Sequence, residues 1–163
     1  EVPEYILKRG TVVNMGGGVV LRVLLPTTEV THAKPHDGML VLQLRYASTT
    51  MLFTGDMEKN LETYLVGLKA RNINNESLRS DILKVGHHGS KTSSSEELLG
   101  YVNPSIAVIS VGALNSYGHP HKEVLDRLAQ FDITVYRTDQ EGDIIFKTDG
   151  SSVCLTSSSL CKF

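Results

Sequence analysis

Three short polar motifs, each directly after a run of apolar residues, set the strongest constraint on the fold of this chain. The motifs are Thr54-Gly55-Asp56, Gly86-His87-His88-Gly89-Ser90 and Asn115-Ser116-Tyr117-Gly118-His119-Pro120-His121. The apolar runs cover residues 51–54, 82–85 and 106–111, and their length and flanking glycines predict buried strands. Side chains at the carboxyl ends of such strands converge on one sheet edge, where open α/β sheets bind ligands. The pattern predicts one metal-centred hydrolytic site.

Strand and helix patterns alternate along the chain, which predicts an α/β fold. Strands are expected at residues 5–7, 19–25, 39–46, 50–54, 81–85, 106–111, 133–136, 144–147 and 153–156. Gly16-Gly17-Gly18 predicts a turn and not a phosphate-binding loop, because no Gly-Lys-Ser/Thr follows it. Further helices are expected after a serine cap at residues 93–95 and from Pro120.

A helix is also expected over residues 58–71, because Leu61, Leu65 and Leu68 follow helical spacing. Its charged residues are assigned to the solvated face: Glu58, Lys59, Glu62 and Lys69.

Length and charge restrict the class of protein. The 163 residues, 40% hydrophobic and 21% charged, indicate one soluble globular domain with a sizeable core. A formal net charge of −2 lacks the basic footprint of a dedicated nucleic-acid binder, so any nucleic acid must be held locally. No apolar run approaches eighteen residues and no signal peptide is recognisable, so we expect no membrane span here, although the chain can be one piece of a larger membrane protein.

Two cysteines occur near the end of the chain. Cys154 and Cys161 do not form a Cys-x-x-Cys motif, so they predict neither a zinc ribbon nor a redox pair. A disulfide between them is left open.

Asp56 is the first candidate ligand. It follows a glycine at the end of a strand, where little side-chain bulk blocks access. Carboxylate oxygens suit zinc and manganese and can bridge two cations. The alternative is an ordinary turn in which Asp56 caps the following helix.

His87 and His88 form the second candidate. The flanking glycines let an imidazole approach a metal or a phosphoryl oxygen closely. Neighbouring side chains on an extended segment point opposite ways, so one ligand is expected, with His87 favoured. A purely structural pair is the alternative. Ser90 and Lys91 follow as hydrogen-bond donors to a phosphate, or as a polar loop with a helix cap.

The third candidate is the loop after the strand at residues 106–111. His119 and His121 flank Pro120, with Asn115 and Tyr117 just upstream. Such donors suit stabilisation of negative charge in a phosphoryl or acyl transition state. Outside the three motifs, His32 and His36 are expected to be surface histidines.

Together, these residues resemble a known family. The matching stretches are residues 52–56, 81–94, 108–112 and 117–125, continued by Tyr136-Arg137-Thr138-Asp139 and Gly142. They resemble the metallo-β-lactamase-like domain of ComEC-type competence proteins, the DNA-uptake channel proteins of naturally transformable bacteria. The resemblance covers the chain from about Leu21 to Gly150.

The resemblance implies an αββα sandwich and a hydrolase with one or two divalent metals, zinc or manganese. In the competence branch it implies a nuclease that degrades the non-transported strand of incoming DNA, outside the inner membrane. Asp56 then resembles the bridging carboxylate and His87 or His88 the last histidine ligand, with metal-bound water as nucleophile. The expected catalytic residues are Asp56, His88, Asn115, Tyr117 and His119. The expected metal ligands are Asp56, His87 and His88, and the substrate-binding residues are Ser90, Lys91, His119 and His121.

One departure from the family is large. A His-x-His/Asp-x-Asp-His run, which supplies most ligands and the base, does not precede Asp56. We therefore expect residues 1–163 to be one partial domain, the C-terminal half, with a mixed sheet, helices on one face, and a last strand and tail at residues 151–163. The missing run favours a piece of a longer protein that is inactive by itself, and leaves open a degenerate binding or assembly module.

Half a sandwich exposes one apolar sheet face. This face is expected to pair with the N-terminal half of the same domain or with a second copy of the chain. The resemblance further implies DNA as the substrate and a membrane channel portion of the parent protein as a partner. Two other interpretations remain: a metal-dependent phosphodiesterase or esterase of the same superfamily, and a purely structural α/β domain. Convergence of Asp56, His87 and His119 at one sheet edge distinguishes a site from the structural interpretation.

Overall fold

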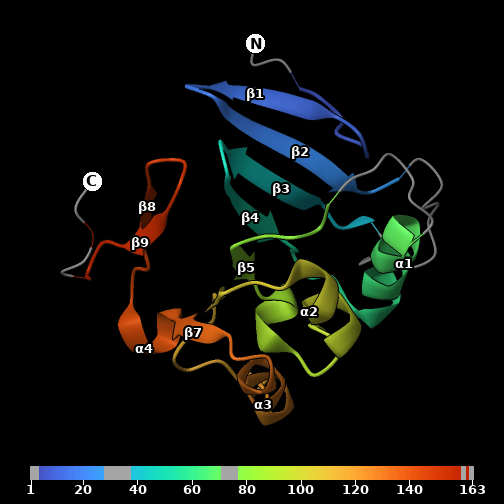
Figure 1. Ribbon diagram of the computed structural model, residues 1–163. Coiled ribbons are helices and arrows are strands. Elements are labelled where there is room, and N and C mark those ends of the chain that lie inside the picture. Colours follow the sequence, from blue (N-terminus) through green and yellow to red (C-terminus); the bar gives the residue numbers. More distant parts are fainter. Residues whose placement is uncertain (1–3, 28–37, 71–76, 159–160, 162–163) are drawn as a thin grey trace.

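A seven-stranded mixed sheet forms the centre of the computed structural model, which describes residues 4–27, 38–70, 77–158 and 161. The strands lie side by side in sequence order (Figure 1). They are β1 (Val12–Gly16), β2 (Val19–Leu25), β3 (Val41–Tyr46), β4 (Thr49–Phe53), β5 (Ile82–Lys84), β6 (Ile106–Ile109) and β7 (Thr134–Arg137). β1 to β4 pair antiparallel, and β4 to β7 pair parallel. The expected surface histidines His32 and His36 lie outside the described residues.

Three helices connect the parallel strands and cover one face of the sheet. They are α1 (Lys59–Ala70), α2 (Glu96–Val102) and α3 (Lys122–Gln130). Because the strand order advances in one direction and such crossovers are right-handed, all three fall on the same face, as Figure 1 shows. The predicted α/β class, mixed sheet and one-sided helices are confirmed. A fourth short helix, α4 (Thr138–Glu141), follows β7 and was not predicted.

The core lies between these helices and the sheet. Leu52, Leu83 and Ala107 are in register on β4, β5 and β6, and each is 0% exposed. The helices contribute the buried residues Leu61, Leu65, Leu98, Leu99, Val124 and Leu128. Each fully buried leucine contributes about 1.5–3 kcal/mol relative to an exposed one. The helical stripe predicted from Leu61 and Leu65 therefore faces the core.

Glu62 departs from the expectation of a solvated face, since it is only 1% exposed. Its carboxylate accepts hydrogen bonds from the backbone amides of Ser94 and Ser95, the latter at 2.8 Å. The α1·α2 contact places this side chain over a polar loop, a tertiary feature that helical spacing does not reveal.

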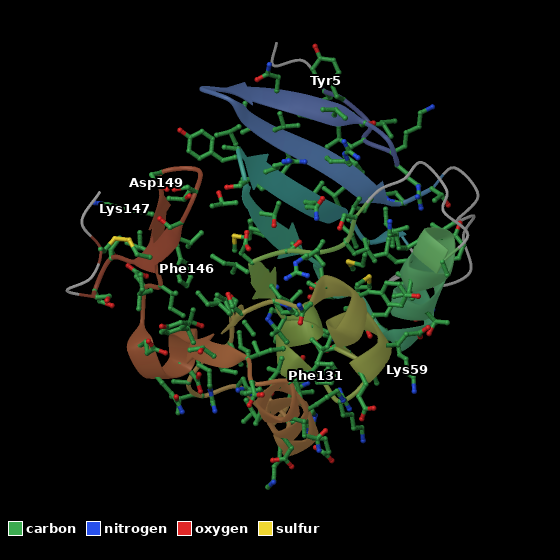
Figure 2. All side chains as sticks on the ribbon, viewed as in Figure 1. Tyr5, Lys59, Phe131, Phe146, Lys147 and Asp149 are labelled. Carbon is green, nitrogen blue, oxygen red and sulfur yellow. A yellow bond between two sulfur atoms is a disulfide. The ribbon has the colours of Figure 1, made fainter. Side chains whose placement is uncertain are left out.

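A small hairpin covers part of the opposite face. It consists of β8 (Phe146–Thr148) and β9 (Val153–Leu155), and Figure 2 labels Phe146, Lys147 and Asp149 on it. Phe146 lines a cavity of about 180 Å³ together with Leu44, Met51 and Ile82, which are in register on β3, β4 and β5. The Thr49 and Thr148 hydroxyls, 3.1 Å apart, fix the hairpin to the sheet.

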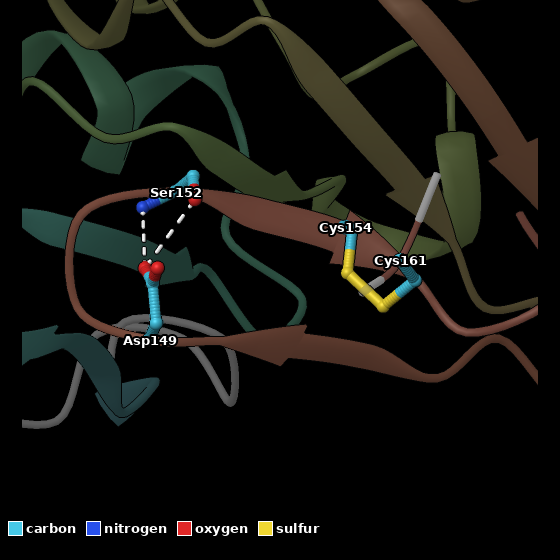
Figure 3. Close-up of a disulfide and its surroundings, with 4 residues drawn as sticks. All are labelled: Asp149, Ser152, Cys154 and Cys161. Carbon is cyan, nitrogen blue, oxygen red and sulfur yellow. Dashed lines mark hydrogen bonds between the residues drawn. A yellow bond between two sulfur atoms is a disulfide. The ribbon is translucent and has the colours of Figure 1, made fainter. Parts of the chain in front are cut away.

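The two ends of the described chain differ from the prediction at the N-terminal side and resolve the open question of the disulfide at the C-terminal side. The expected strand at residues 5–7 does not form; Tyr5 is 79% exposed beyond β1, and the first strand begins at Val12. Cys154 on β9 forms a disulfide with Cys161, with 5.3 Å between Cα atoms (Figure 3). No helix among the described residues combines the length and apolar character that a membrane crossing requires.

Candidate functional site

Asp56 and His88 form a close pair at the carboxyl ends of β4 and β5. Parallel pairing of Phe53 with Lys84 brings the ends of these strands together. His88 Nε2 lies 3.7 Å from Asp56 Oδ1. Asp56 does not occupy the helix-cap position proposed as its alternative role, because α1 begins three residues later at Lys59.

The orientation of the His88 ring is fixed from behind. Its Nδ1 lies 2.6 Å from the backbone oxygen of Ser110, directly after β6. A carbonyl can only accept a hydrogen bond, so Nδ1 carries the proton and donates it. In the neutral ring, the lone pair of Nε2 is then available on the side of Asp56. This is the arrangement in which a metal-ligating histidine is held by a second hydrogen bond.

The backbone of the histidine motif is a tight left-handed turn, η3 (Gly86–Gly89), with φ of 47° at His87 and 55° at His88. The two rings therefore do not alternate as on an extended strand; their centroids are 6.4 Å apart and their planes are 65° apart. Left-handed non-glycine residues cost about 1–3 kcal/mol each and cluster at functional sites. The sequence favoured His87 as the ligand, and this turn instead brings His88 to Asp56.

Neighbouring loops pack closely against this turn on two sides. A Cβ on Gly86 would lie 2.9 Å from the Met57 carbonyl oxygen, and a Cβ on Gly89 would lie 2.6 Å from Pro120 Cβ. The amide of His87 donates to the Gly55 carbonyl at 3.1 Å. These contacts bind the histidine turn to both the Asp56 turn and the Pro120 loop.

His87 faces a second set of side chains. Its Nδ1 lies 3.5 Å from Glu58 Oε1, and its ring centroid is 5.8 Å from that of His119. The His119 and His121 rings are 5.1 Å apart. Burial lowers the pKa of His119, and charges on His121, His87 and His88 lower it further, so His119 is neutral at neutral pH.

Asn115 and Tyr117 have different surroundings although both belong to the third motif. The Asn115 amide donates to the carbonyls of Gly112 and His119, and its oxygen accepts from the His119 amide at 2.9 Å. Asn115 thus closes its own loop. Tyr117 is 77% exposed and stacks on the His119 ring, with 5.8 Å between centroids.

Ser90 and Lys91 directly follow the histidine turn, and their side chains have different surroundings. Ser90 is buried, with its hydroxyl 3.0 Å from that of Thr92. Lys91 lines a separate depression of about 460 Å³ with Lys59 and Arg127. The structure therefore gathers Asp56, His87, His88, His119 and His121, and places Lys91 elsewhere.

Two nearby charged residues were absent from the predicted site. Lys84, the last residue of β5, is partly buried; burial lowers its pKa, while the Asp56 carboxylate opposes this shift. Glu58 accepts a hydrogen bond from the Thr92 hydroxyl at 3.0 Å and faces His87. A lysine that ends an otherwise apolar strand, just before the histidine motif, was the available signal for Lys84.

The donors present do not complete a metal site by themselves. Within the described ranges, no group of three or more His, Cys, Asp or Glu side chains is placed to hold one ion. Protein zinc sites use three or four protein ligands. Asp56 and His88 thus amount to a two-donor pair.

Comparison with known proteins supports the resemblance drawn from the motifs. Residues 2–113 match the family model described as "Metallo-beta-lactamase superfamily". The chain is 36% identical over 141 residues to "ComE operon protein 3" of Bacillus subtilis (strain 168), covering 86% of the chain and 17% of that protein. It is 35% identical over 127 residues to "Recombination protein 2" of Haemophilus influenzae (strain ATCC 51907 / DSM 11121 / KW20 / Rd), covering 78% of the chain and 15% of that protein.

A third relative also matches this chain over a small share of its own length. The chain is 40% identical over 106 residues to "Competence protein ComA" of Neisseria gonorrhoeae, covering 65% of the chain and 15% of that protein. The chain therefore spans only 15–17% of the length of these curated relatives.

Proposed function

Because the chain belongs to the metallo-β-lactamase superfamily, we propose that it forms part of a metal-dependent hydrolase domain of a competence protein, acting as a nuclease on DNA taken up in transformation. The names of its relatives support the setting, since two of them are a competence protein and a recombination protein. The observation that carries the proposal is the Asp56–His88 pair at the carboxyl ends of β4 and β5.

Asp56 and His88 supply two donors for a divalent cation, zinc or manganese. The cation contributes Lewis-acid chemistry when bound. The remaining donors come from residues outside the described ones, as the missing His-x-His/Asp-x-Asp-His run requires. This chain alone is accordingly inactive and binds metal weakly.

The other residues of the cluster contact the substrate. A neutral His119 donates a hydrogen bond to a phosphate oxygen, and the exposed Tyr117 ring beside it adds an aromatic surface. His121 extends the donor row at 5.1 Å from His119. His87, paired with Glu58, supports the turn on which His88 lies.

Two observations support the setting that we propose for the domain. The Cys154–Cys161 disulfide favours an oxidising compartment, which supports the extracytoplasmic side of a bacterial inner membrane. The sheet face opposite the helices is only partly covered by the hairpin, and the N-terminal half of the same domain is proposed to cover the rest. A homodimer through this face is the alternative.

A degenerate binding or assembly module is the second candidate function. The absence, among the described residues, of any group of three metal donors favours it. Another phosphodiester or ester substrate for the same site is a variant of the first proposal.

Metal content and nuclease activity separate the two candidates. Single-stranded and double-stranded DNA are incubated with manganese or zinc and either this chain or the parent protein that carries the missing histidine run. We expect activity in the longer protein alone, reduced about 10–100-fold or more by Asp56→Ala and by His88→Ala, since loss of a group that merely supports a metal ligand already costs about 10–100-fold. Lys147→Ala, on the hairpin, is the control and should retain activity. A parent protein without metal or activity would instead establish the binding module.

A further inference from the structure

Three arginines line a concavity at the edge of the sheet opposite the Asp56–His88 pair. Arg22, Arg45 and Arg79 surround a cavity of about 270 Å³, together with Gln43 and Thr50. Thr50 lies near the start of β4, whereas Asp56 follows its end. At about 3.3 Å per residue, the part of β4 from Thr50 to its end at Phe53 spans about 10 Å and separates the two places.

Strand register creates this cluster from residues that are far apart in the sequence. Arg22 on β2 pairs with Gln43 on β3, and Arg45 pairs with Thr50 on β4. Partners in register point to the same face of a sheet. Because Gln43 also pairs with Leu52, which faces the core under the helices, the cluster lies on the helix-bearing face.

Arg79 reaches the same concavity from the segment before β5. The Gln43 amide donates to the backbone oxygens of Ser77 and Arg79, both at 3.1 Å. It also contacts the Ser80 hydroxyl at 3.1 Å. These bonds fix the segment against β3, so the position of Arg79 is set by the fold.

Two of the three guanidinium groups, those of Arg45 and Arg79, have unused hydrogen-bond donors. Arg45 uses Nε to donate to the Ala47 carbonyl at 2.9 Å. Within the described part of the chain, the Arg79 side chain makes no hydrogen bond or ion pair, and neither do the terminal nitrogens of Arg45. The nearby Asp81 carboxylate accepts from the amide and hydroxyl of Thr50, at 2.7 and 3.1 Å.

Charge makes the cluster notable. The whole chain has a formal net charge of −2, so three cations around one concavity do not reflect a basic composition. Like charges repel each other, and a bound anion relieves that repulsion. Guanidinium groups match phosphate oxygens with paired hydrogen bonds.

We propose that Arg22, Arg45 and Arg79 bind the phosphodiester backbone of a nucleic-acid strand, as a docking site separate from the Asp56–His88 pair. The choice of a nucleic-acid strand rests on the proposed function. The contacts are to phosphates, so binding is independent of base sequence. The site holds the strand while a neighbouring stretch reaches the other end of β4.

Binding of a fluorescein-labelled thymidine oligonucleotide to the 163-residue chain tests this site. Fluorescence anisotropy is measured in EDTA, so that no hydrolysis occurs. For Arg45→Ala/Arg79→Ala we expect about tenfold weaker binding at low salt, and a salt slope of log K against log salt shallower by about 1.4, or about 0.7 per lost contact. Both side chains are exposed, and circular dichroism checks that the variant is folded.

Two further variants and one competitor complete the test. Lys8→Ala/Lys147→Ala removes the same charge from other exposed positions and should bind within about twofold of the parent chain. Arg45→Lys/Arg79→Lys keeps the charge and should recover part of the affinity. An equal loss of affinity in Arg45→Ala/Arg79→Ala and in Lys8→Ala/Lys147→Ala would overturn the proposal. So would displacement of the oligonucleotide by millimolar inorganic phosphate at constant ionic strength, which would identify a free-phosphate site.

The oligonucleotide-binding result does not depend on whether the protein hydrolyses DNA. If the longer protein that carries the histidine run lacks nuclease activity while Arg45→Ala/Arg79→Ala still weakens oligonucleotide binding, the proposed function fails and the docking site stands. If activity is present and the arginine effect is absent, the docking site fails.

Discussion

Single residues hold the histidine turn in an unusual shape. Gly89 has a φ of 82°, and a Cβ there would lie 2.6 Å from Pro120 Cβ. The Gly89 carbonyl also accepts from the His121 amide at 2.9 Å. The identity of this one residue therefore links the geometry of His88 to that of the third motif.

Gly89→Ala should destabilise the protein by about 2–4 kcal/mol, because left-handed strain and a close contact add together. Urea denaturation measures the free energy of unfolding. Gly118→Ala is the matched control: Gly118 has a φ of 71° and a Cβ added there would meet nothing within 4 Å, so strain alone should cost about 1 kcal/mol. Equal losses in the two variants would show that the Pro120 contact is unimportant.

At the scale of elements, a buried carboxylate on α1 and a guanidinium group on α3 join two helices to the loop that supports the site. Glu62 on α1 accepts from the amides of Ser94 and Ser95, and Arg127 on α3 donates to the carbonyls of Ser93 and Ser94. The Ser93 hydroxyl in turn donates to the Gly86 carbonyl at 2.7 Å. The loop after the histidine turn is thus held from both helices.

Glu62→Ala should cost about 2–4 kcal/mol at pH 7, since it leaves the amides of the buried Ser94 and the partly buried Ser95 without their acceptor. Urea denaturation at several pH values measures this loss. Glu96→Ala, at an exposed position on α2, is the control and should change stability by less than about 0.5 kcal/mol.

The contribution of Glu62 to the free energy of unfolding should also depend on pH, in a direction that its pKa shift determines. Burial raises the pKa of Glu62 above 4.5, against the opposing effects of its hydrogen bonds and Arg127. Between 4.5 and the raised pKa, the folded state binds more protons than the unfolded state, so this group's contribution to stability falls as pH rises through that window. The stability gap between the unsubstituted chain and Glu62→Ala should therefore widen as pH falls through the raised pKa toward 4.5. A gap that narrows would contradict the raised pKa.

On the scale of the whole molecule, the two faces of the sheet are covered differently. Three helices pack on one face, whereas the β8–β9 hairpin covers part of the other (Figure 1). The hairpin turn is ordered by Asp149, whose carboxylate accepts from the amides of Ser151 and Ser152 at 2.8 Å. These hydrogen bonds lower the pKa of Asp149 to about 2, so the turn keeps its charge well into acid.

The Cys154–Cys161 disulfide should stabilise the hairpin end of the molecule by about 2 kcal/mol in the chain-entropy account of a short loop. Cys154→Ser/Cys161→Ser should speed hydrogen exchange in β8 and β9 and leave exchange in β5 and η3 unchanged. Thiol alkylation of the native protein checks the bond itself, with a reduced sample as control. Two alkylated cysteines before reduction would mean that the bond does not form.

The sequence by itself determined the strands of the parallel half, the helical stripe of α1 and the meeting of the three polar motifs. These features follow from local periodicity and from the rule that parallel strands end at one edge. It also identified the family, because motif residues and their spacing are properties of the sequence.

Tertiary structure alone decided which side chains meet. The choice of His88 beside Asp56 depends on a left-handed turn whose φ values are imposed by packing against Met57 and Pro120. The burial of Glu62 and the gathering of three arginines depend on helix contact and strand register between distant segments. Local sequence patterns do not predict the burial of Glu62 or the arginine cluster, because both features arise from contacts between residues far apart in the chain.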